Sequence, residues 1–305
     1  MRYAPAAGQE PGVQKCHQDC HGYSGFINAP TPYGSFIARF LVRNNGTDLE
    51  TVHEIQNQMA LTPVPPLNEV PHRFSAPPLS IDMLNSSLPQ DKASRTMELT
   101  ARIHQYNPPR NISDFPHVHR MLWTAGIRHG RYEPHVKNLT AVAQRAAQSV
   151  QATAAKPGNR VDLDNGWSSI GPDVQGDYGI TYKMRAYVAW YGYLALTASE
   201  AQYPNYYSPE THDATLNLEA NEAFIVTLNG KPPLTTDGFW SLTAYNSQQY
   251  LIDNPMDRYS LGDRSPLTYP DGTLVYGGES KDEDRPFQLL VQPRDVQPPK
   301  NWTSK

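Results

Sequence analysis

The chain of 305 residues is long enough for two domains of ordinary size, and hydrophobic residues, at 38%, are sufficient to build cores. A net charge of −4 without any cluster of Lys and Arg argues against a nucleic-acid-binding protein, which needs a basic patch. No segment reaches the roughly 18 apolar residues that span a membrane, and the best candidate, residues 186–198, is typical of a buried core helix.

The first predicted element is a strand at residues 35–43, where apolar side chains alternate with arginines. After an Asn-Asn-Gly turn, Thr47 and Glu50 have the spacing of a capping box, which predicts a helix that begins after Thr47. This helix would bury an apolar stripe made of Leu49, Val52, Ile55 and Met59. Residues 62–89 are rich in proline and predict an extended connection between modules.

The middle of the chain has helical periodicity. Residues 94–106 predict one helix, which the sequence Asn-Pro-Pro at residues 107–109 would end. Residues 134–155 predict a longer amphipathic helix, because apolar residues recur at spacings of three and four. These residues are Val136, Leu139, Val142, Ala143, Ala146 and Val150. A third helix is expected at about residues 180–197.

The last third of the chain favours strands again. Alternating apolar residues predict short strands at residues 224–228 and 240–244, and further strands are expected at 274–276 and 287–291. The 28 Pro and 18 Tyr of the chain also favour strands joined by rigid loops. The predicted order is therefore β, then α, then β.

Motifs in this last region resemble those of a known family. A Phe-Trp-Ser-Leu-Thr-x-Tyr strand is followed by Asn, Arg-Tyr and Asp-Gly, at residues Phe239, Trp240, Ser241, Leu242, Thr243, Tyr245, Asn254, Arg258, Tyr259, Asp271 and Gly272. Upstream, Tyr182-x-x-Arg185-Ala186 and Gly230-x-Pro232-Pro233 also match. Together these motifs resemble the domain of unknown function 1214, and residues 31–62 are similar to the end of its companion, the domain of unknown function 1254.

The resemblance implies an α+β fold that is mainly β with a helical segment. It predicts a remnant of an N-terminal β-sandwich at residues 1–75, a linker and helical segment at 76–165, and a C-terminal jelly-roll-like β-sandwich at 166–305. Family members occur in bacteria and fungi, and the many aromatic residues and glycosylation sequons here are more typical of the fungal ones.

The resemblance also implies export, since many family members are secreted. Relatives carry an export signal and a longer first sandwich, and they continue beyond an Asn-Trp pair into a further strand. This chain starts without an apolar signal segment and stops soon after Trp302, so we expect it to be clipped at both ends and without a signal peptide of its own. Export agrees with five sequons for N-glycosylation, at Asn45, Asn85, Asn111, Asn138 and Asn301.

The two cysteines of the chain lie in the segment KCHQDCHG, residues 15–22. Cys16, His17, Cys20 and His21 offer four metal ligands, but Cys-x3-Cys with adjacent histidines is not a standard zinc spacing. A thioredoxin-like redox site needs Cys-x-x-Cys at the start of a helix, which is absent from this sequence. The resemblance to exported proteins instead implies a local disulfide between Cys16 and Cys20.

No metal site or cofactor is expected elsewhere. His117 and His119 form a His-x-His pattern, which can bind a metal from one face of a strand. Here the pair leads into a predicted helix, on which the two side chains diverge, so a solvent-facing or helix-capping role is expected. The sequence contains no pattern typical of serine hydrolases, phosphate-binding loops or dinucleotide-binding folds.

Arg185 is the leading candidate for ligand binding. It lies in an apolar predicted helix, so we expect it to be buried and paired, because an unpaired buried charge is costly. The acceptor would be Asp213, Asp237, or a carboxylate or enolate group of a ligand. Arg258 has the same two interpretations, and the aromatic strand around Trp240 is expected to fill the core. The predicted binding residues are Tyr182, Arg185, Trp240, Tyr245, Arg258 and Tyr259.

Two classes of function remain. The first is an enzyme or accessory protein of small-molecule metabolism, in a fungal secondary-metabolite pathway, that acts on a small-molecule ligand without a nucleotide cofactor. The alternative is an exported β-sandwich protein that binds a glycan or a protein partner without catalysis. A deep apolar cavity with a few convergent polar groups would favour the first, and a flat exposed row of aromatic side chains would favour the second.

Overall fold

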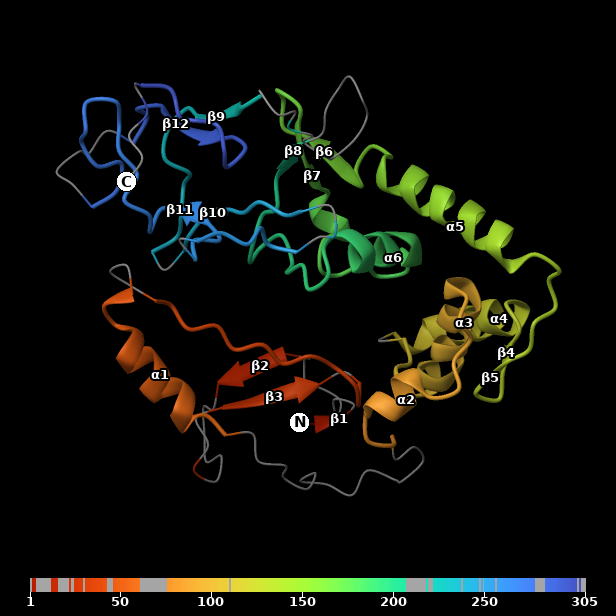
Figure 1. Ribbon diagram of the computed structural model, residues 1–305. Coiled ribbons are helices and arrows are strands. Elements are labelled where there is room, and N and C mark those ends of the chain that lie inside the picture. The colour runs from red at the N-terminus through yellow and green to blue at the C-terminus, as the bar shows by residue number, and fades with distance from the viewer. Residues whose placement is uncertain are drawn as a thin grey trace. The chain divides into compact units, whose positions relative to one another are not determined.

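The computed structural model describes residues 2–3, 12–15, 22, 25–29, 31–42, 46–60, 76–109, 111–206, 218, 222–236, 238–246, 248, 250–255, 257–277, 283–300 and 302. The chain forms two compact units. Unit 1 comprises residues 1–37 and 62–215, and unit 2 comprises residues 38–61 and 216–305. Both units contain helices and strands, which confirms the mixed α+β class (Figure 1). The division into segments 1–75, 76–165 and 166–305 stays a prediction.

Unit 1 holds most of the described helices. Its helices are α2 (Ile81–Asn85), α3 (Lys92–Ile103), α4 (Phe115–Thr124), α5 (Leu139–Ala154) and α6 (Tyr182–Tyr191). Short 3-10 helices lie at His104–Tyr106, Ile112–Asp114 and Pro172–Val174. The strands are β1 (Arg2–Tyr3), β2 (Gly12–Lys15), β3 (Gly25–Ala29), β4 (Ile127–Arg128), β5 (Arg131–Tyr132), β6 (Arg160–Asp162), β7 (Trp167–Ile170) and β8 (Asn205–Tyr206).

The strands of unit 1 form three small sheets. The first has the order β1-β3-β2, in which β1 is parallel and β2 antiparallel to β3. The second is the hairpin of β4 and β5, and the third is the antiparallel sheet β6-β7-β8. The described sheets have two or three strands each, so the predicted β-sandwich of this region stays unconfirmed.

Side-chain caps explain where three helices of unit 1 begin. The carboxylate of Asp91 accepts a hydrogen bond from the amide of Ser94 at 2.8 Å, and this bond lowers the pKa of Asp91. Asn138 caps α5 in the same way, by accepting from the amide of Ala141 at 2.9 Å, and Ser80 caps α2. The helices predicted at 94–106 and 134–155 are thus confirmed. Helix α3 starts and ends earlier than predicted, at Lys92 and Ile103, and α5 starts later and ends earlier, at Leu139 and Ala154.

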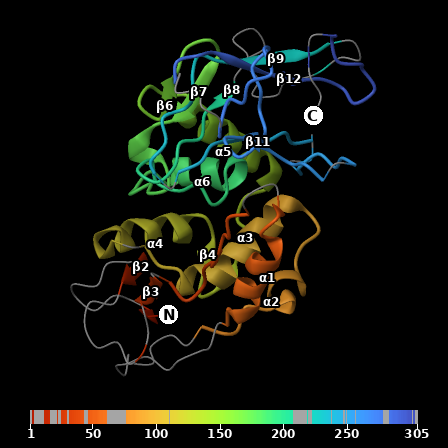
Figure 2. The same ribbon diagram turned by 90° about the vertical axis from the view of Figure 1, so that its left-hand side faces the viewer.

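The core of unit 1 lies where α6 packs beside α5 (Figure 1, Figure 2). Met184 is fully buried and packs with Ala154 of α5 and Val174. Ile170, Tyr178 and Tyr187 surround this cluster and are partly buried. Met184 and Val188 are one helical turn apart, so α6 presents one narrow apolar face to the core.

Unit 2 contains α1 (Leu49–Gln58) and two strand pairs. The antiparallel pair of β9 (Phe224–Leu228) and β12 (Phe287–Val291) runs from Phe224 opposite Val291 to Leu228 opposite Phe287. The strands β10 (Ser241–Leu242) and β11 (Leu261–Gly262) form the second antiparallel pair. Gly262 is required in β11, because a Cβ atom there would lie 2.1 Å from the carbonyl oxygen of Trp240.

Aromatic residues form the core of unit 2. Tyr269, Val275 and Phe287 are buried, and Leu228, Trp240, Leu267 and Tyr276 pack against them. The indole N–H of Trp240 donates a hydrogen bond of 2.7 Å to the hydroxyl of Tyr276, so the polar end of each ring is satisfied inside the cluster. The predicted strands at 224–228 and 287–291 and the inward position of Trp240 are confirmed.

A charged clasp covers this core. The guanidinium of Arg285 lies 3.8 Å from the centroid of the Tyr269 ring and donates to the Asp271 carboxylate at 2.8 Å. The Thr273 hydroxyl and amide donate to the other oxygen of Asp271 at 2.6 Å and 3.0 Å. The Thr273 hydrogen bonds and then Arg285 lower the pKa of Asp271 to about 2.

Several sequence predictions differ from the structure in their local detail. Described residues 34–42 form no strand, because a strand needs a hydrogen-bonded neighbour, and both Phe36 and Ile37 are exposed. Helix α1 begins after Asp48 rather than Thr47, which moves Glu50 out of the capping-box position. Of its apolar stripe, Val52 alone is buried. The strand predicted at 240–244 is shorter and consists of β10. In the predicted strand 274–276, Leu274 forms an isolated bridge with Thr268. Helix α6 ends at Tyr191 instead of at residue 197.

We predict that Met184→Ala destabilises unit 1 by about 2–5 kcal/mol, because it leaves a cavity between α5 and α6. Urea unfolding followed by circular dichroism measures the change. The matched control is Met121→Ala, since Met121 is 40% exposed on α4 and its replacement should change the free energy of unfolding little. Equal effects of the two substitutions would contradict the position of the core.

We predict that Asp271 makes the stability of unit 2 depend on acid pH. Its pKa of about 2 lies below the roughly 3.9 of an unfolded chain, so the clasp stabilises fully above about pH 4 and is lost as the pH falls toward 2. Asp271→Asn should therefore lower the urea midpoint at pH 7, and the difference from the wild type should shrink below pH 4. A carboxyl pKa near 3.9, measured by NMR, would rule the clasp out.

Candidate ligand-binding site on unit 1

An open hollow of about 510 Å³ lies beside the start of α6. Its lining residues come from the turn before α6 and from the loop after it, namely Pro172, Asp173, Gln175, Asp177, Gly179, Thr197, Ala198 and Ser199. This volume is within the roughly 300–1,000 Å³ of small-molecule sites. Most lining residues are exposed, so the α6 hollow is open to solvent.

Gln175 joins the two walls of the α6 hollow. Its side chain is 1% exposed, and its amide nitrogen donates to the carbonyls of Leu196 at 3.0 Å and Ala201 at 2.6 Å. The turn and the loop therefore meet through hydrogen bonds in a place that water barely reaches. Two hydrogen bonds to backbone groups fix the position of the loop relative to α6.

Gly176 allows the two walls to approach closely. Its φ of +73° is unfavourable for other residues, and a Cβ atom there would lie 2.5 Å from the backbone nitrogen of Thr197. The two residues of the Gln-Gly sequence therefore have separate roles. Gln175 supplies the side-chain amide, and Gly176 leaves room for the backbone of Thr197.

The polar side chains that line the α6 hollow are carboxylates, hydroxyls and one amide. Asp173 and Asp177 supply carboxylates, and the hydroxyls of Thr197 and Ser199 lie 3.1 Å apart. The side-chain oxygen of Gln175 is buried and has no hydrogen-bond partner. No Lys, Arg or His lines the hollow. A ligand rich in hydroxyl or N–H donors would complement this surface.

The described part of the chain gives no support for a metal centre. Within them, no group of three or more His, Cys, Asp or Glu side chains is arranged to hold a metal ion. His117 and His119 lie on α4, as predicted, and His119 stacks between Phe115 and Trp123 at centroid distances of 6.3 Å and 6.1 Å.

Arg185 lies on the outer side of α6, and the prediction that it is buried was wrong. The reason is helical geometry: Met184 and Val188 turn toward the core, which places Arg185 next to them on the solvent side. Its guanidinium carbon lies 5.7 Å from the ring centroid of Tyr178 and 5.8 Å from that of Tyr182. The predicted acceptors Asp213 and Asp237 lie outside the described residues.

The two tyrosine rings hold Arg185 by cation–π attraction. Tyr178 also packs against the core of unit 1, and burial raises the pKa of its hydroxyl. A hydrogen bond with the backbone of Gly176 and the charge of Arg185 offset part of that rise. Tyr178 thus connects the arginine to the turn that lines the α6 hollow.

A pair of exposed aromatic rings ends α6. The rings of Trp190 and Tyr191 lie within 16° of parallel at a centroid distance of 6.0 Å, and the residues are 64% and 51% exposed. The side-chain amide of Gln151 on α5 donates to the Tyr191 hydroxyl at 3.2 Å, which fixes that ring. The expected burial of residues 186–198 was therefore wrong, because within the described chain α6 packs mainly on α5 and its buried face is narrow, with Met184 and Val188.

The structure splits the predicted binding residues between the units. It brings Arg185 and Tyr182 together in unit 1. In unit 2, Trp240 belongs to the core, whereas Tyr245 and Tyr259 are 59% and 40% exposed on the segment between β10 and β11. The backbone around Arg258 is fixed by Asn254, whose side chain exchanges two hydrogen bonds with it. No described contact joins these four residues into a site.

Sequence reasoning missed Gln175, Tyr178 and the pair of Trp190 and Tyr191. The spacing Asp-x-Gln-x-Asp in residues 173–177 was a detectable signal, since polar oxygens at every second position are unusual next to an apolar helix. Trp190 and Tyr191 were missed because an apolar helical segment is usually buried.

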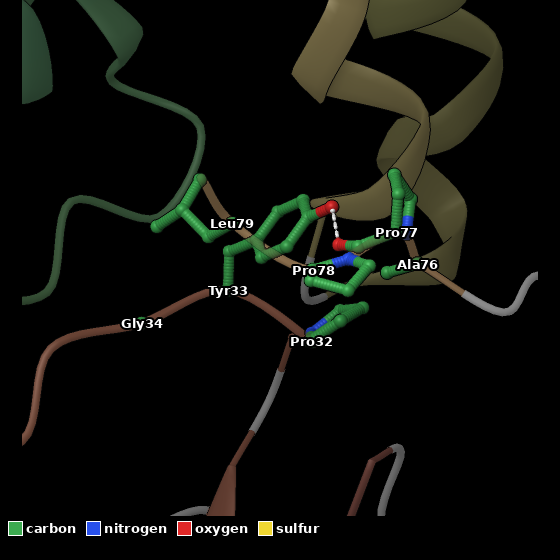
Figure 3. A pocket seen from close by; sticks show the side chains of 7 residues that line it. All are labelled: Pro32, Tyr33, Gly34, Ala76, Pro77, Pro78 and Leu79. Carbon is green, nitrogen blue, oxygen red and sulfur yellow. Dashed lines mark hydrogen bonds between the residues drawn. The ribbon is translucent and has the colours of Figure 1, made fainter. Parts of the chain in front are cut away.

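A second hollow, of about 470 Å³, has a structural explanation. It is lined by Pro32, Tyr33, Gly34, Ala76, Pro77, Pro78 and Leu79. Figure 3 shows the Tyr33 hydroxyl directed at the Pro77 carbonyl, to which it donates a hydrogen bond. Tyr33 also packs edge-on against Tyr106 at 5.7 Å, and burial raises its pKa. The Tyr33 hydroxyl is already hydrogen-bonded, so this hollow offers few polar groups to a ligand. We interpret it as a contact between Tyr33 and the surrounding prolines.

Three of the predicted glycosylation sites can be located. Asn85, Asn111 and Asn138 are exposed, and each uses its side-chain oxygen as an acceptor, from Arg95, Ser113 and Ala141. Sugar is added to the side-chain nitrogen, which these bonds leave available. Asn45, Asn301, Cys16 and Cys20 lie outside the described residues, so those sites and the disulfide stay predictions.

Within the described part of the chain, no helix has the length and hydrophobicity needed to cross a membrane. This agrees with the absence of a spanning segment in the sequence.

Two family models match the chain. One, described as "Protein of unknown function (DUF1214)", matches residues 200–304. The other, described as "Protein of unknown function (DUF1254)", matches residues 7–63. No curated protein and no solved structure matches the chain.

We predict that Gln175→Ala loosens the loop that forms one wall of the α6 hollow. The substitution leaves the carbonyls of Leu196 and Ala201 without their donor, at a cost of about 1–3 kcal/mol. Hydrogen exchange of the Glu200 and Ala201 amides, which both bond to Thr197, should become faster.

The control for this prediction is Gln202→Ala, which removes one exposed local bond to Ala198. It should leave the exchange rates within the loop nearly unchanged. Equal acceleration in both variants would show that Gln175 does not hold the loop.

Proposed function

We propose that this chain, which belongs to the family that carries the domains of unknown function 1254 and 1214, binds a carbohydrate on unit 1. The binding face comprises the α6 hollow and the exposed rings of Trp190 and Tyr191. Both lie within residues 172–199, and the loop after α6 leads directly from the rings into the wall of the hollow.

The aromatic pair is the observation that carries the proposal. Two large rings that are nearly parallel and more than half exposed are uncommon on a soluble surface, where such area lowers solubility. A pyranose has an apolar face of C–H groups that packs flat against an aromatic ring, while its hydroxyls remain free at the edge. Trp and Tyr suit this contact because they combine an apolar face with a polar tip.

The acceptor groups of the α6 hollow supply the other half of the recognition. Sugar hydroxyls are donors, and carboxylates such as those of Asp173 and Asp177 accept the strongest hydrogen bonds from them. The side-chain oxygen of Gln175 is an unsatisfied acceptor, but it is buried. A nucleic acid is not expected as a ligand, because these carboxylates would repel its phosphates.

The same observations favour binding over catalysis. An enzyme of small-molecule metabolism would need a cavity that excludes water and a reactive group beside a base. The α6 hollow is open, and the groups that line it include no His, Cys or Lys. The small-molecule reaction and the fungal secondary-metabolite pathway expected from the sequence therefore stay predictions without a described site.

The ligand class fits an exported glycoprotein. The exposed sequons at Asn85, Asn111 and Asn138 support passage through a glycosylating compartment, because each has an accessible side-chain nitrogen. A carbohydrate-binding protein in such a compartment meets polysaccharides of cell walls and of the extracellular matrix.

We predict that neutral oligosaccharides bind the full chain and that Trp190→Ala weakens this binding about tenfold, through loss of ring stacking. Asp173→Ala should weaken it by a similar factor, because a charge-assisted hydrogen bond is lost. Isothermal titration with cello-, chito-, xylo- and galacto-oligosaccharides measures both effects.

The matched control is Phe115→Ala, which removes a 52% exposed aromatic ring from α4 in the same unit. Its affinity for oligosaccharides should equal that of the wild type. If no oligosaccharide binds at millimolar concentration, or if Phe115→Ala weakens binding as much as Trp190→Ala, the proposed function fails.

A further inference from the structure

The guanidinium of Arg185 has no acceptor within the described chain, and it lies over the ring of Tyr178, the residue between Asp177 and Gly179 of the α6 hollow. Its described contacts are the rings of Tyr178 and Tyr182, which attract its charge but accept none of its N–H groups. Lys183 differs, since its ammonium group donates to the Ser149 hydroxyl at 2.7 Å. Within the described chain, the five N–H donors of Arg185 are thus left for solvent or for a ligand.

The two rings position this donor group in advance. An arginine on a helix surface ordinarily samples many rotamers, and fixing them on binding costs entropy. Cation–π contacts on two sides restrict the side chain before a ligand arrives, so less entropy is lost when the N–H groups form hydrogen bonds.

A planar carboxylate matches this arrangement better than a phosphate or a sulfate does. One guanidinium edge forms two parallel N–H···O bonds with a carboxylate. Phosphate sites generally add a helix N-terminus or further cations. Arg185 projects from the side of α6 rather than from its N-terminus. The ammonium group of the neighbouring Lys183 already donates a hydrogen bond to Ser149. One guanidinium group with no second free cation beside it among the described residues is suited to binding one carboxylate.

Charge also determines where that carboxylate lies. Asp173 and Asp177 line the α6 hollow and repel a second anion there. Tyr178, which stacks with Arg185, lies between Asp177 and Gly179 of the hollow in the chain. The face thus has an acidic end that accepts hydroxyl donors and a basic end that donates to an anion.

We infer that the carbohydrate bound by this protein is acidic, an oligosaccharide that contains uronic acid, whose carboxylate pairs with Arg185 while its hydroxyls meet the α6 hollow. This inference rests on the proposed function, since it specifies the ligand of the same face. It adds that the ligand is negatively charged and that Arg185 binds its carboxylate.

The test compares an oligogalacturonide with its methyl ester, two ligands that differ in the charge of the carboxyl group alone. For the wild type, the free acid should bind about threefold more tightly than the ester, because an ion pair at an exposed site is worth a factor of roughly 1.4 to 5 in affinity. The preference should shrink in 0.5 M NaCl, which screens exposed charges.

Variants assign the preference to one residue. Arg185→Gln should lower the affinity for the acid to that for the ester without changing the affinity for the ester. Arg185→Lys should keep part of the preference, since it retains a charge but loses the fork. The matched control Arg145→Gln removes an exposed arginine from α5, changes the net charge equally and should keep the full preference.

The outcomes separate the two proposals. Equal affinities for acid and ester in the wild type overturn the acidic ligand and leave the carbohydrate site intact. A preference that survives in Arg185→Gln, or is lost in Arg145→Gln, overturns the role of Arg185. If a neutral oligosaccharide binds but neither the acid nor the ester does, the inference fails and the proposed function stands. If no oligosaccharide of either kind binds, both fail.

Discussion

The pair of hydrogen bonds from Gln175 to the carbonyls of Leu196 and Ala201 is the constraint on which the binding face depends. These bonds join the chain before α6 to the chain after it, where Gly176 leaves no room for a side chain. They form almost out of contact with water, which makes them costly to lose. The α6 hollow therefore exists because a buried amide closes the loop around one helix.

Helix α6 then decides which residues face solvent. It buries Met184 and Val188, and among the described helices it packs mainly on α5. Arg185 and Trp190 consequently lie on the outside, although the sequence around them is as apolar as a core helix. The same exposure that would be a liability for solubility supplies an aromatic surface and a cation that a ligand can reach.

The two units use aromatic residues in opposite ways. In unit 2, Trp240 and Tyr276 satisfy each other by a hydrogen bond and pack on Phe287, and the clasp of Arg285 and Asp271 closes the cluster. In unit 1, Trp190 and Tyr191 stack on each other, the centroid of the Tyr191 ring also lies 4.9 Å from that of Tyr187, and both residues remain more than half exposed. Arginine shows the same contrast: Arg285 has a carboxylate beside its tyrosine, whereas Arg185 has tyrosines alone within the described chain. Charge pairing separates a structural arginine from one available to a ligand.

The sequence by itself predicted helices at 94–106 and 134–155, close to the observed 92–103 and 139–154, as well as strands at 224–228 and 287–291 and the family, because periodicity, alternation and motif order are local properties. It could not determine the fate of Arg185 or Trp190, since burial depends on how many neighbours pack around α6. Likewise, the alternation at 35–43 predicts a strand only if another strand pairs with it, and none does in the described residues. Tertiary contacts alone decided these positions, because exposure and pairing are properties of segments far apart in the chain.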